Sequence, residues 1–126
     1  MTAFADDFAK WFYQGKRMDY ALAQKLADGL LDAWHYGDAE DRSQVLSFVF
    51  WTKVSDRFPL IVEALLEANE PIAKYACGIA HSLIFNGYDL GPEIEQALDA
   101  FGSRFPESKQ LSSDARQLLQ EQHEDS

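Results

Sequence analysis

Apolar residues recur along the chain at the three- and four-residue spacing of amphipathic helices. No stretch alternates apolar and polar residues as a half-buried strand does. The pattern therefore predicts an all-α protein of about seven helices. The predicted helices follow one another closely, over residues 4–15, 19–37, 38–55, 59–68, 69–87, 92–102 and from about 111 to 122.

Residues typical of helix ends mark these boundaries. Small polar side chains stand where three of the helices begin, and prolines stand in or near three first turns. Glycines follow the last apolar residue of four helices, where the left-handed conformation that closes a helix is accessible to glycine. The predicted N-caps are Asp19, Asp38 and Asn69, the first-turn prolines are Pro59, Pro71 and Pro92, and the terminating glycines are Gly15, Gly37, Gly87 and Gly102.

The joints between predicted helices are short, so consecutive helices are expected to form antiparallel hairpins. We predict a single all-helical domain over residues 1–122. It would consist of a capping helix and three hairpins, followed by a polar tail that frays. The capping helix covers residues 1–15, the hairpins cover 19–55, 58–87 and 91–122, and the tail covers 123–126.

Two internal matches indicate that the hairpins repeat. LADGLLDA (26–33) aligns with IVEALLEA (61–68) at an offset of 35, pairing aliphatic, acidic and small residues position by position. PLIVEALLEA (59–68) aligns more loosely with PEIEQALDAF (92–101) at an offset of 33. Any two amphipathic helices share a period, but the similar offsets, the recurring proline and the second helix after each copy exceed that background.

FPLIVEALLEANEPIAKYACGIAHSL, residues 58–83, resembles a HEAT-type unit. PLIVEALL fits the first helix of such a unit, NEP fits the acidic, proline-containing joint, and the inner face of the second helix is rich in Ile and Ala. The usual Arg of that second helix is missing because Ala73 stands there, and the offset is shorter than the roughly 40–47 residues of HEAT and armadillo units. The resemblance implies a short HEAT-like α-solenoid in which the second helices line the concave side.

The charge balance favours a protein partner with a basic surface. Twenty-one Asp and Glu face eleven Lys and Arg, for a formal net charge of −10. Nucleic-acid phosphates and anionic membranes would repel such a chain. The N-terminus shows no secretory signal, no apolar run could span a bilayer, and Cys77 is the single cysteine, so we expect a cytoplasmic protein without an internal disulfide.

Residues able to carry chemistry are few. Cys77 and His81 stand four apart on one predicted helix, which would suit a thiolate–imidazole pair, but a cysteine among small residues is usually a packing residue. A stable zinc site needs three or four ligands, so Cys77 and His81 alone would not bind zinc. Paired carboxylates lie at helix starts, where the exposed N–H groups and the helix dipole account for them. We therefore predict no catalytic, cofactor-binding or metal-binding residues.

Aromatic side chains exceed what one buried helix face can hide. A neighbouring hairpin would cover some of them, and a symmetric dimer would cover others, but exposed rings beside charges are also typical of interface anchors. On the helix over 69–87, the residues left outside the core are Lys74, Tyr75, Gly78, His81, Ser82 and Phe85. The predicted anchors are Trp51, Tyr75, His81, Phe85 and Tyr88, with an acidic rim of Asp38, Glu40, Asp41, Glu70 and Asp89.

Size, acidity and fold type together suit an immunity or inhibitor protein that neutralises a basic toxin or enzyme by occluding it. This assignment is an analogy of class, because no motif establishes it. An acidic DNA mimic is a variant of the same idea. The alternatives are a structural or adaptor HEAT-like subunit of a larger assembly, and an enzyme using Cys77 and His81.

Overall fold

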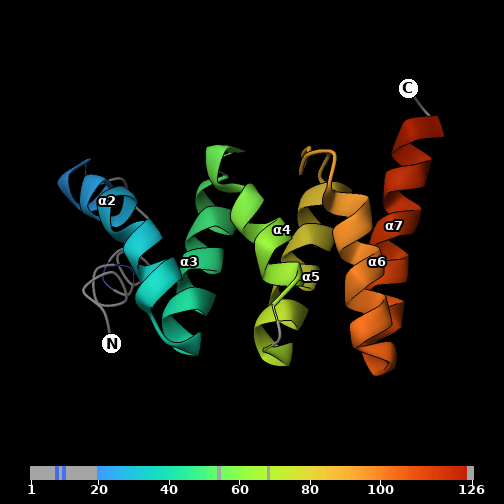
Figure 1. The fold of residues 1–126 in the computed structure, drawn as a ribbon. Helices are drawn as coiled ribbons and strands as arrows, with labels where there is room; N and C mark the ends of the chain where they lie inside the picture. The colour runs from blue at the N-terminus through green and yellow to red at the C-terminus, as the bar shows by residue number, and fades with distance from the viewer. Residues whose placement is uncertain (1–7, 9, 11–19, 54, 68, 125–126) are drawn as a thin grey trace. The chain divides into compact units, whose positions relative to one another are not determined.

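The computed structural model describes residues 8, 10, 20–53, 55–67 and 69–124. These residues form helices joined by short turns, and they contain no strand, which confirms the predicted all-α class. The described residues hold six bounded α-helices, α2 to α7 (Figure 1). The predicted helix over residues 4–15 and the predicted N-cap Asp19 lie outside the described residues, apart from positions 8 and 10. By its internal packing the chain divides into unit 1 (residues 1–51) and unit 2 (residues 52–126).

Unit 1 contains α2 (Tyr20–Tyr36) and α3 (Ala39–Thr52). The turn between them needs glycine, because a Cβ at Gly37 would collide with the backbone oxygen of Ala33 and with Cβ of Asp41. Asp38 then starts α3 as predicted. The apolar residues that the period placed inward are buried, among them Leu26, Leu30 and Trp34 of α2 and Val45, Phe48 and Val49 of α3.

A reciprocal cap closes the start of α3. The Asp41 N–H donates to Oδ1 of Asp38 at 2.9 Å, and the Asp38 N–H donates to Oδ2 of Asp41 at 3.1 Å. The Asp41 side chain is only 2% exposed as a result. The prediction that Asp41 belongs to an exposed acidic rim is corrected here, because its carboxylate caps the backbone of its own helix.

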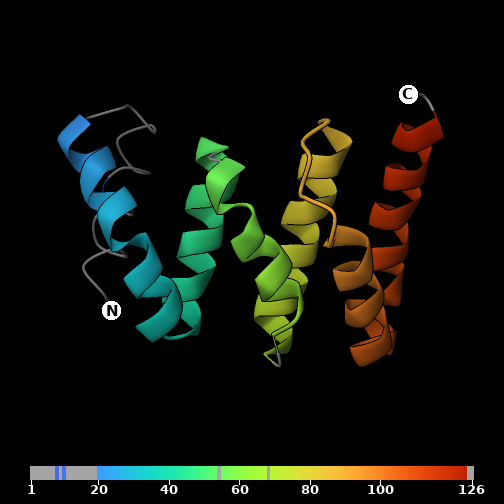
Figure 2. The same ribbon diagram turned by 45° about the horizontal axis from the view of Figure 1, so that its top comes forward.

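Unit 2 contains two helical hairpins. Its helices and 3₁₀ turns are η1 (Ser55–Arg57), α4 (Pro59–Leu65), α5 (Glu70–Phe85), α6 (Ile94–Arg104), η2 (Pro106–Ser108) and α7 (Lys109–Glu124). α4 pairs with α5 and α6 with α7, while α4 also lies against α6 and α5 against α7 (Figure 2). The first helices of the hairpins therefore form one layer of unit 2, and the second helices form the other.

The ends of α5 follow their predicted signals. Oδ1 of Asn69 accepts the Ile72 N–H at 3.1 Å, with a proline in the first turn. At the other end Gly87 adopts φ +87°, its N–H donates to Ile84 O at 3.0 Å, and the Tyr88 N–H donates to Leu83 O at 2.9 Å. These two bonds are the Schellman arrangement that satisfies the last carbonyls of a helix. They turn the chain sharply into the connection that leads to α6.

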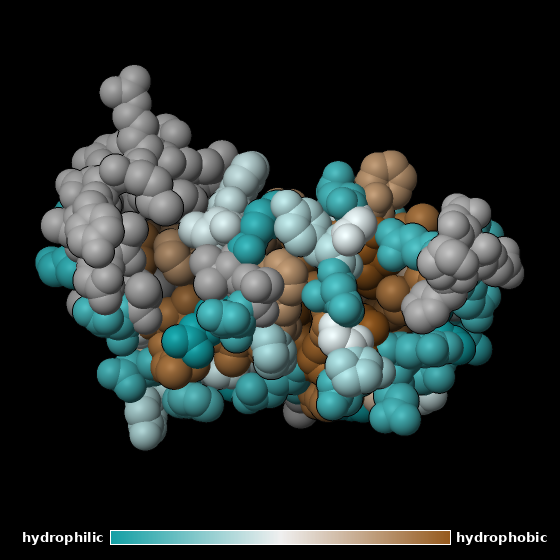
Figure 3. Space-filling model, turned by 90° about the horizontal axis from the view of Figure 1, so that it is seen from above, coloured by the Kyte–Doolittle hydropathy of each residue, from teal (hydrophilic) through white to brown (hydrophobic). Residues whose placement is uncertain are grey.

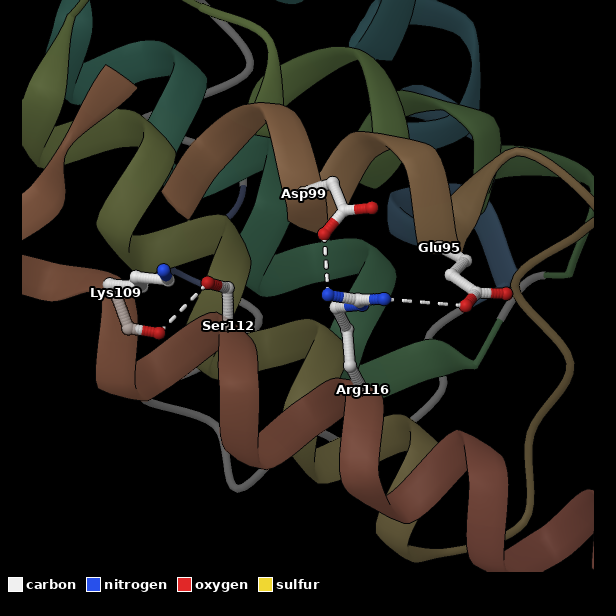
Figure 4. Close-up of polar contacts among 5 residues, drawn as sticks. All are labelled: Glu95, Asp99, Lys109, Ser112 and Arg116. Carbon is white, nitrogen blue, oxygen red and sulfur yellow. Dashed lines mark hydrogen bonds and ion pairs between the residues drawn. The ribbon is translucent and has the colours of Figure 1, made fainter. Parts of the chain in front are cut away.

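The hairpin of α6 and α7 is closed by small residues at one end and by charges at the other. α6 continues through Gly102 to Arg104. A Cβ at Gly102 would lie 2.9 Å from Oγ of buried Ser112 on α7, so glycine here allows the two helices to lie close together. The predicted end of this helix at Gly102 is therefore wrong by two residues. Arg116 on α7 reaches back to α6 and pairs with Asp99 at 2.5 Å and with Glu95 at 3.5 Å (Figure 4).

In the described parts of the chain, no helix is both long and apolar enough to cross a membrane.

Candidate protein-binding site

One face of α5 is outside the core of unit 2. Its exposed and half-buried positions recur at helical spacing, while the residues on its other faces are buried. The prediction for the residues left outside this core is confirmed: they are Lys74, Tyr75, Gly78, His81, Ser82 and Phe85. Tyr75 is 42% exposed and Phe85 is 70% exposed. Two of the predicted anchors therefore lie on an accessible surface of the same helix.

A cleft of about 760 Å³ lies beyond the C-terminal end of this face. Buried Leu90 and Ile94 contribute to its apolar wall, together with half-buried Leu119 from α7. Its other lining residues are Gly87, Tyr88, Asp89, Gly91, Pro92, Glu95, Gln120 and Gln122. Figure 3 looks toward the end of unit 2 that carries the α5–α6 connection, and apolar surface appears there between hydrophilic side chains. Cleft size and lining fall within the range of ordinary ligand sites.

The charged residues that line the cleft are all negative. Among the described residues that line it, Asp89 and Glu95 are the only ones that carry a charge, and both are exposed carboxylates. Oδ1 of Asp89 accepts the Gly91 N–H at 2.8 Å, which fixes the turn before α6. Glu95 shares Arg116 with Asp99, so its position is also fixed from α7. Because Asp89, Glu95 and Asp99 outnumber the single Arg116, the cleft offers net negative charge and apolar contact to the same ligand.

Tyr88, a predicted anchor, packs part of its ring against the core of unit 2. Its ring packs edge-on against buried Phe58, with ring centroids 6.0 Å apart and an interplanar angle of 88°. Nζ of Lys53 lies 6.0 Å from the centroid of the same ring, and burial lowers the pKa of Lys53. The Tyr88 side chain keeps 37% exposure and lines the cleft. It can thus contact a ligand while its inner edge stays packed.

A second, smaller hollow of about 210 Å³ lies between α5 and α7. It is bounded by Cys77, Gly78, His81, Leu111 and Asp114, so the predicted anchor His81 lines it. Burial raises the pKa of the Cys77 thiol to about 11, which keeps it protonated at neutral pH and disfavours a thiolate–imidazole pair. No group of three or more potential metal ligands occurs in the described residues.

The predicted rim residues have different environments. Oε1 of Glu70 pairs with Nζ of Lys74 at 3.2 Å, one turn along α5. Asp38 and Glu40 are exposed at the start of α3, and Trp51 is 44% exposed near its end with its ring against Phe50. These last residues belong to unit 1, and the site in unit 2 is built without them.

Sequence reasoning missed the apolar wall of the cleft and its α7 side. The apolar pattern places Ile94 and Leu119 only on the buried stripes of their predicted helices, and it gives Leu90 no role. The glycine–proline run GYDLGP (87–92) was the available signal, because two glycines and a proline between helices indicate a shaped connection. The contribution of α7 could not be found, since it depends on contact between segments about thirty residues apart.

Comparisons with family models, with curated proteins and with solved structures give no match to this chain. Residues 52–126 hold thirteen Asp and Glu against six Lys and Arg, so −7 of the net −10 belongs to the unit that contains the cleft. At least three of the six basic groups in this unit make internal contacts. Arg104 donates to the backbone oxygens of Leu66 and Glu67, and Arg116 and Lys74 pair with carboxylates.

Proposed function

We propose that this protein is a non-enzymatic binding module that inhibits a basic toxin or enzyme by occluding it, as an immunity protein does. The observation that carries the proposal is the cleft beside α5, which combines an apolar wall, the edge of Tyr88 and carboxylates as its charged lining. A basic protein would bury Lys or Arg stems against the wall and place their charges near Asp89 and Glu95. Complementary charge of this kind speeds association and rejects wrong partners.

The exposed rings of α5 support the same proposal. Phe85 leaves most of its ring in solvent close to the end of α5 that opens into the cleft, and Tyr75 lies three turns earlier. Aromatic side chains that become desolvated at the centre of an interface supply much of its binding energy. The protein would then hold its partner by rings and attract it by charge.

The layering of unit 2 supports a HEAT-like array as the scaffold. First helices next to first helices and second helices next to second helices are the neighbour relations of stacked hairpins. The matched segments overlap α2, α4 and α6, and each of these helices is followed by a second helix. The second helix α5 would then present its exposed face as part of the binding surface.

An adaptor role in a larger assembly is the alternative. It uses the same scaffold and the same cleft, and it differs in what the partner does once bound. An inhibitor abolishes the partner's activity at stoichiometric concentration, whereas an adaptor leaves it intact. The two are therefore separated by an activity assay on the purified partner.

The test compares two substitutions of equal charge. Gln120 lines the cleft and Gln96 is an exposed residue of α6 outside it, and lysine matches glutamine in helix propensity. Tagged wild type, Gln120→Lys and Gln96→Lys are used to capture partners from the source cell, and the affinity and activity of the captured protein are then measured. We expect a basic protein that is inhibited by the wild type and bound at least about tenfold more weakly by Gln120→Lys than by Gln96→Lys. Equal affinity of both variants would refute the cleft as the site.

A further inference from the structure

Gly78 occupies an unusual position in α5. It lies in the middle of a sixteen-residue helix, and it is exposed. Glycine in a helix interior lowers stability relative to alanine, because it has more backbone freedom to lose on folding. Apart from its two chain neighbours and the nearby backbone of α5, no described atom lies within 4 Å of the place where a Cβ on Gly78 would be. Packing among the residues that the structure describes therefore gives no reason for a glycine here.

Gly102, in α6, is a helical glycine whose packing does explain why the residue is glycine. At Gly102 a Cβ would lie 2.9 Å from Oγ of Ser112 and 3.3 Å from Cγ of Lys109, so α6 and α7 can approach closely only if this residue is glycine. Gly78 has open space where Gly102 has a neighbouring helix. The surface over Gly78 is therefore open to another molecule.

The open space above Gly78 is the hollow between α5 and α7. Leu111 provides exposed apolar surface on the α7 side, where it is 44% exposed. Asp114 provides a carboxylate, and Nε2 of Gln110 donates to its Oδ1 at 2.7 Å, which holds that side chain in place. Lys74, one turn before Gly78, has its ammonium group engaged by Glu70 at 3.2 Å. The hollow thus combines a backbone floor, an aliphatic wall and a negative charge.

We propose that this hollow receives one long cationic side chain, lysine or arginine, from the basic partner of the protein. Its aliphatic stem would lie over Gly78 and against Leu111, and its charged end would reach Asp114. Charge complementarity is the argument for a cation over an apolar side chain, since unit 2 carries a net charge of −7. The inference rests on the proposed function, and it adds a specificity pocket to the cleft already described.

The geometry also fixes where the partner's next basic residue should be. Gly78 and Gly87, at the edge of the cleft, are nine residues apart, which along the helix is about 13 Å. α5 and α7 lie side by side over this distance. A partner helix lying along them would meet both depressions with basic residues about eight positions apart, which fall on one of its faces.

The test uses a synthetic probe, so the partner need not be identified first. The probe is an Ala- and Gln-based helical peptide with two arginines eight positions apart, and the controls replace both arginines by glutamate or by leucine. Binding is followed in ¹⁵N-labelled full-length protein by NMR, in which the Gly78 amide reports directly on the hollow. We expect the arginine peptide to shift the amide signals of Gly78 and Asp114, and the glutamate peptide to leave them unchanged.

Two substitutions test the hollow itself. Gly78→Gln fills it and should raise Tm by about 2–5 °C, because glutamine is a better helix former and its Cβ has open space at this position. It should nevertheless weaken the peptide at least about fivefold, while Ser103→Gln on the exposed side of α6 should not. Asp114→Asn keeps the acceptor for Gln110 and removes the charge, and it should also weaken the arginine peptide. Glu63→Gln on α4 is the matched control for charge.

The outcomes separate this inference from the proposed function. Unchanged peptide affinity in Gly78→Gln would overturn the hollow as a binding pocket, and equal binding of the leucine peptide would overturn its cationic occupant. If the cellular partner is lost in Gln120→Lys but kept in Gly78→Gln, the cleft function stands and the hollow inference falls. If the arginine peptide binds at Gly78 and no basic protein is captured, the hollow stands and the proposed partner falls.

Discussion

Two rings in unit 2 should differ sharply in what they contribute to stability. Phe85 is 70% exposed, whereas Tyr88 is 37% exposed and packs edge-on against Phe58. A whole aromatic side chain buries about 150–250 Å². The structure thus leaves Phe85 with about 60 Å² of buried ring and Tyr88 with about 125 Å².

At about 25 cal/mol per Å², these areas correspond to about 1.5 kcal/mol for Phe85 and about 3 kcal/mol for Tyr88. Alanine at position 85 recovers about 0.5 kcal/mol of helix propensity, while loss of the ring pair adds about 1 kcal/mol at position 88. Both areas are upper estimates, because an unfolded chain also buries some surface. We therefore expect Phe85→Ala to cost about 1 kcal/mol and Tyr88→Ala about 4 kcal/mol.

Urea unfolding followed by far-ultraviolet circular dichroism measures both costs. Tryptophan fluorescence would not serve, because all three tryptophans lie within residues 1–51. Tyr88→Phe, which keeps the ring, should stay within about 1 kcal/mol of the wild type. If Phe85→Ala lost as much stability as Tyr88→Ala, Phe85 would be a core residue and the accessible α5 face would lose its principal ring.

Three further predictions concern caps and the buried thiol. Asp38→Ala should lower the stability of unit 1 by about 1 kcal/mol, because it removes a side-chain cap of α3. Urea unfolding followed by tryptophan fluorescence measures this loss, and an unchanged midpoint would show that the cap contributes nothing. Arg104→Lys should lower the stability of unit 2 by about 1 kcal/mol, because lysine cannot reproduce the two hydrogen bonds of the guanidinium to the backbone oxygens after α4. Urea unfolding followed by circular dichroism measures the loss, and full stability in the lysine variant would contradict this. The pKa of Cys77 is raised to about 11, so the unfolded chain loses its thiol proton first and stability should fall by about 2–3 kcal/mol between about pH 9 and pH 11. Cys77→Ala should lack this part of the pH dependence, and parallel curves for the two proteins would refute the assignment.

Local patterns predicted the helices well, because the information lies within one or two turns. The Asn69 cap, the Gly87 termination and the exposed face of α5 were all readable from spacing alone. The burial of Asp41 was readable in principle, since an acid three residues after an N-cap is a capping-box pattern. The sequence places Asp41 at a helix start, and its capping bond leaves the residue buried instead of on an exposed rim.

Tertiary packing decided the features that the sequence could not predict. Gly102 has the local signature of a helix end, yet α6 continues past it to Arg104, and the glycine makes room for α7 instead. The cleft needs the α5–α6 connection to meet the far end of α7, and no local pattern encodes that meeting. The end of α3 was not predictable from local pattern either. The helix ends at Thr52, three residues before the predicted boundary at residue 55, and the next residue, Lys53, adopts φ +56°.

Hydrogen–deuterium exchange on the complex with the captured basic protein tests the central claim most directly. The account predicts slower exchange on binding in residues 87–95 and 119–122, which line the cleft, with added protection around Gly78 and Leu111 if the hollow is also filled. Exchange in α4 should be unchanged. Protection confined to α4 and to the outer side of α6, with the cleft exchanging as in the free protein, would contradict it.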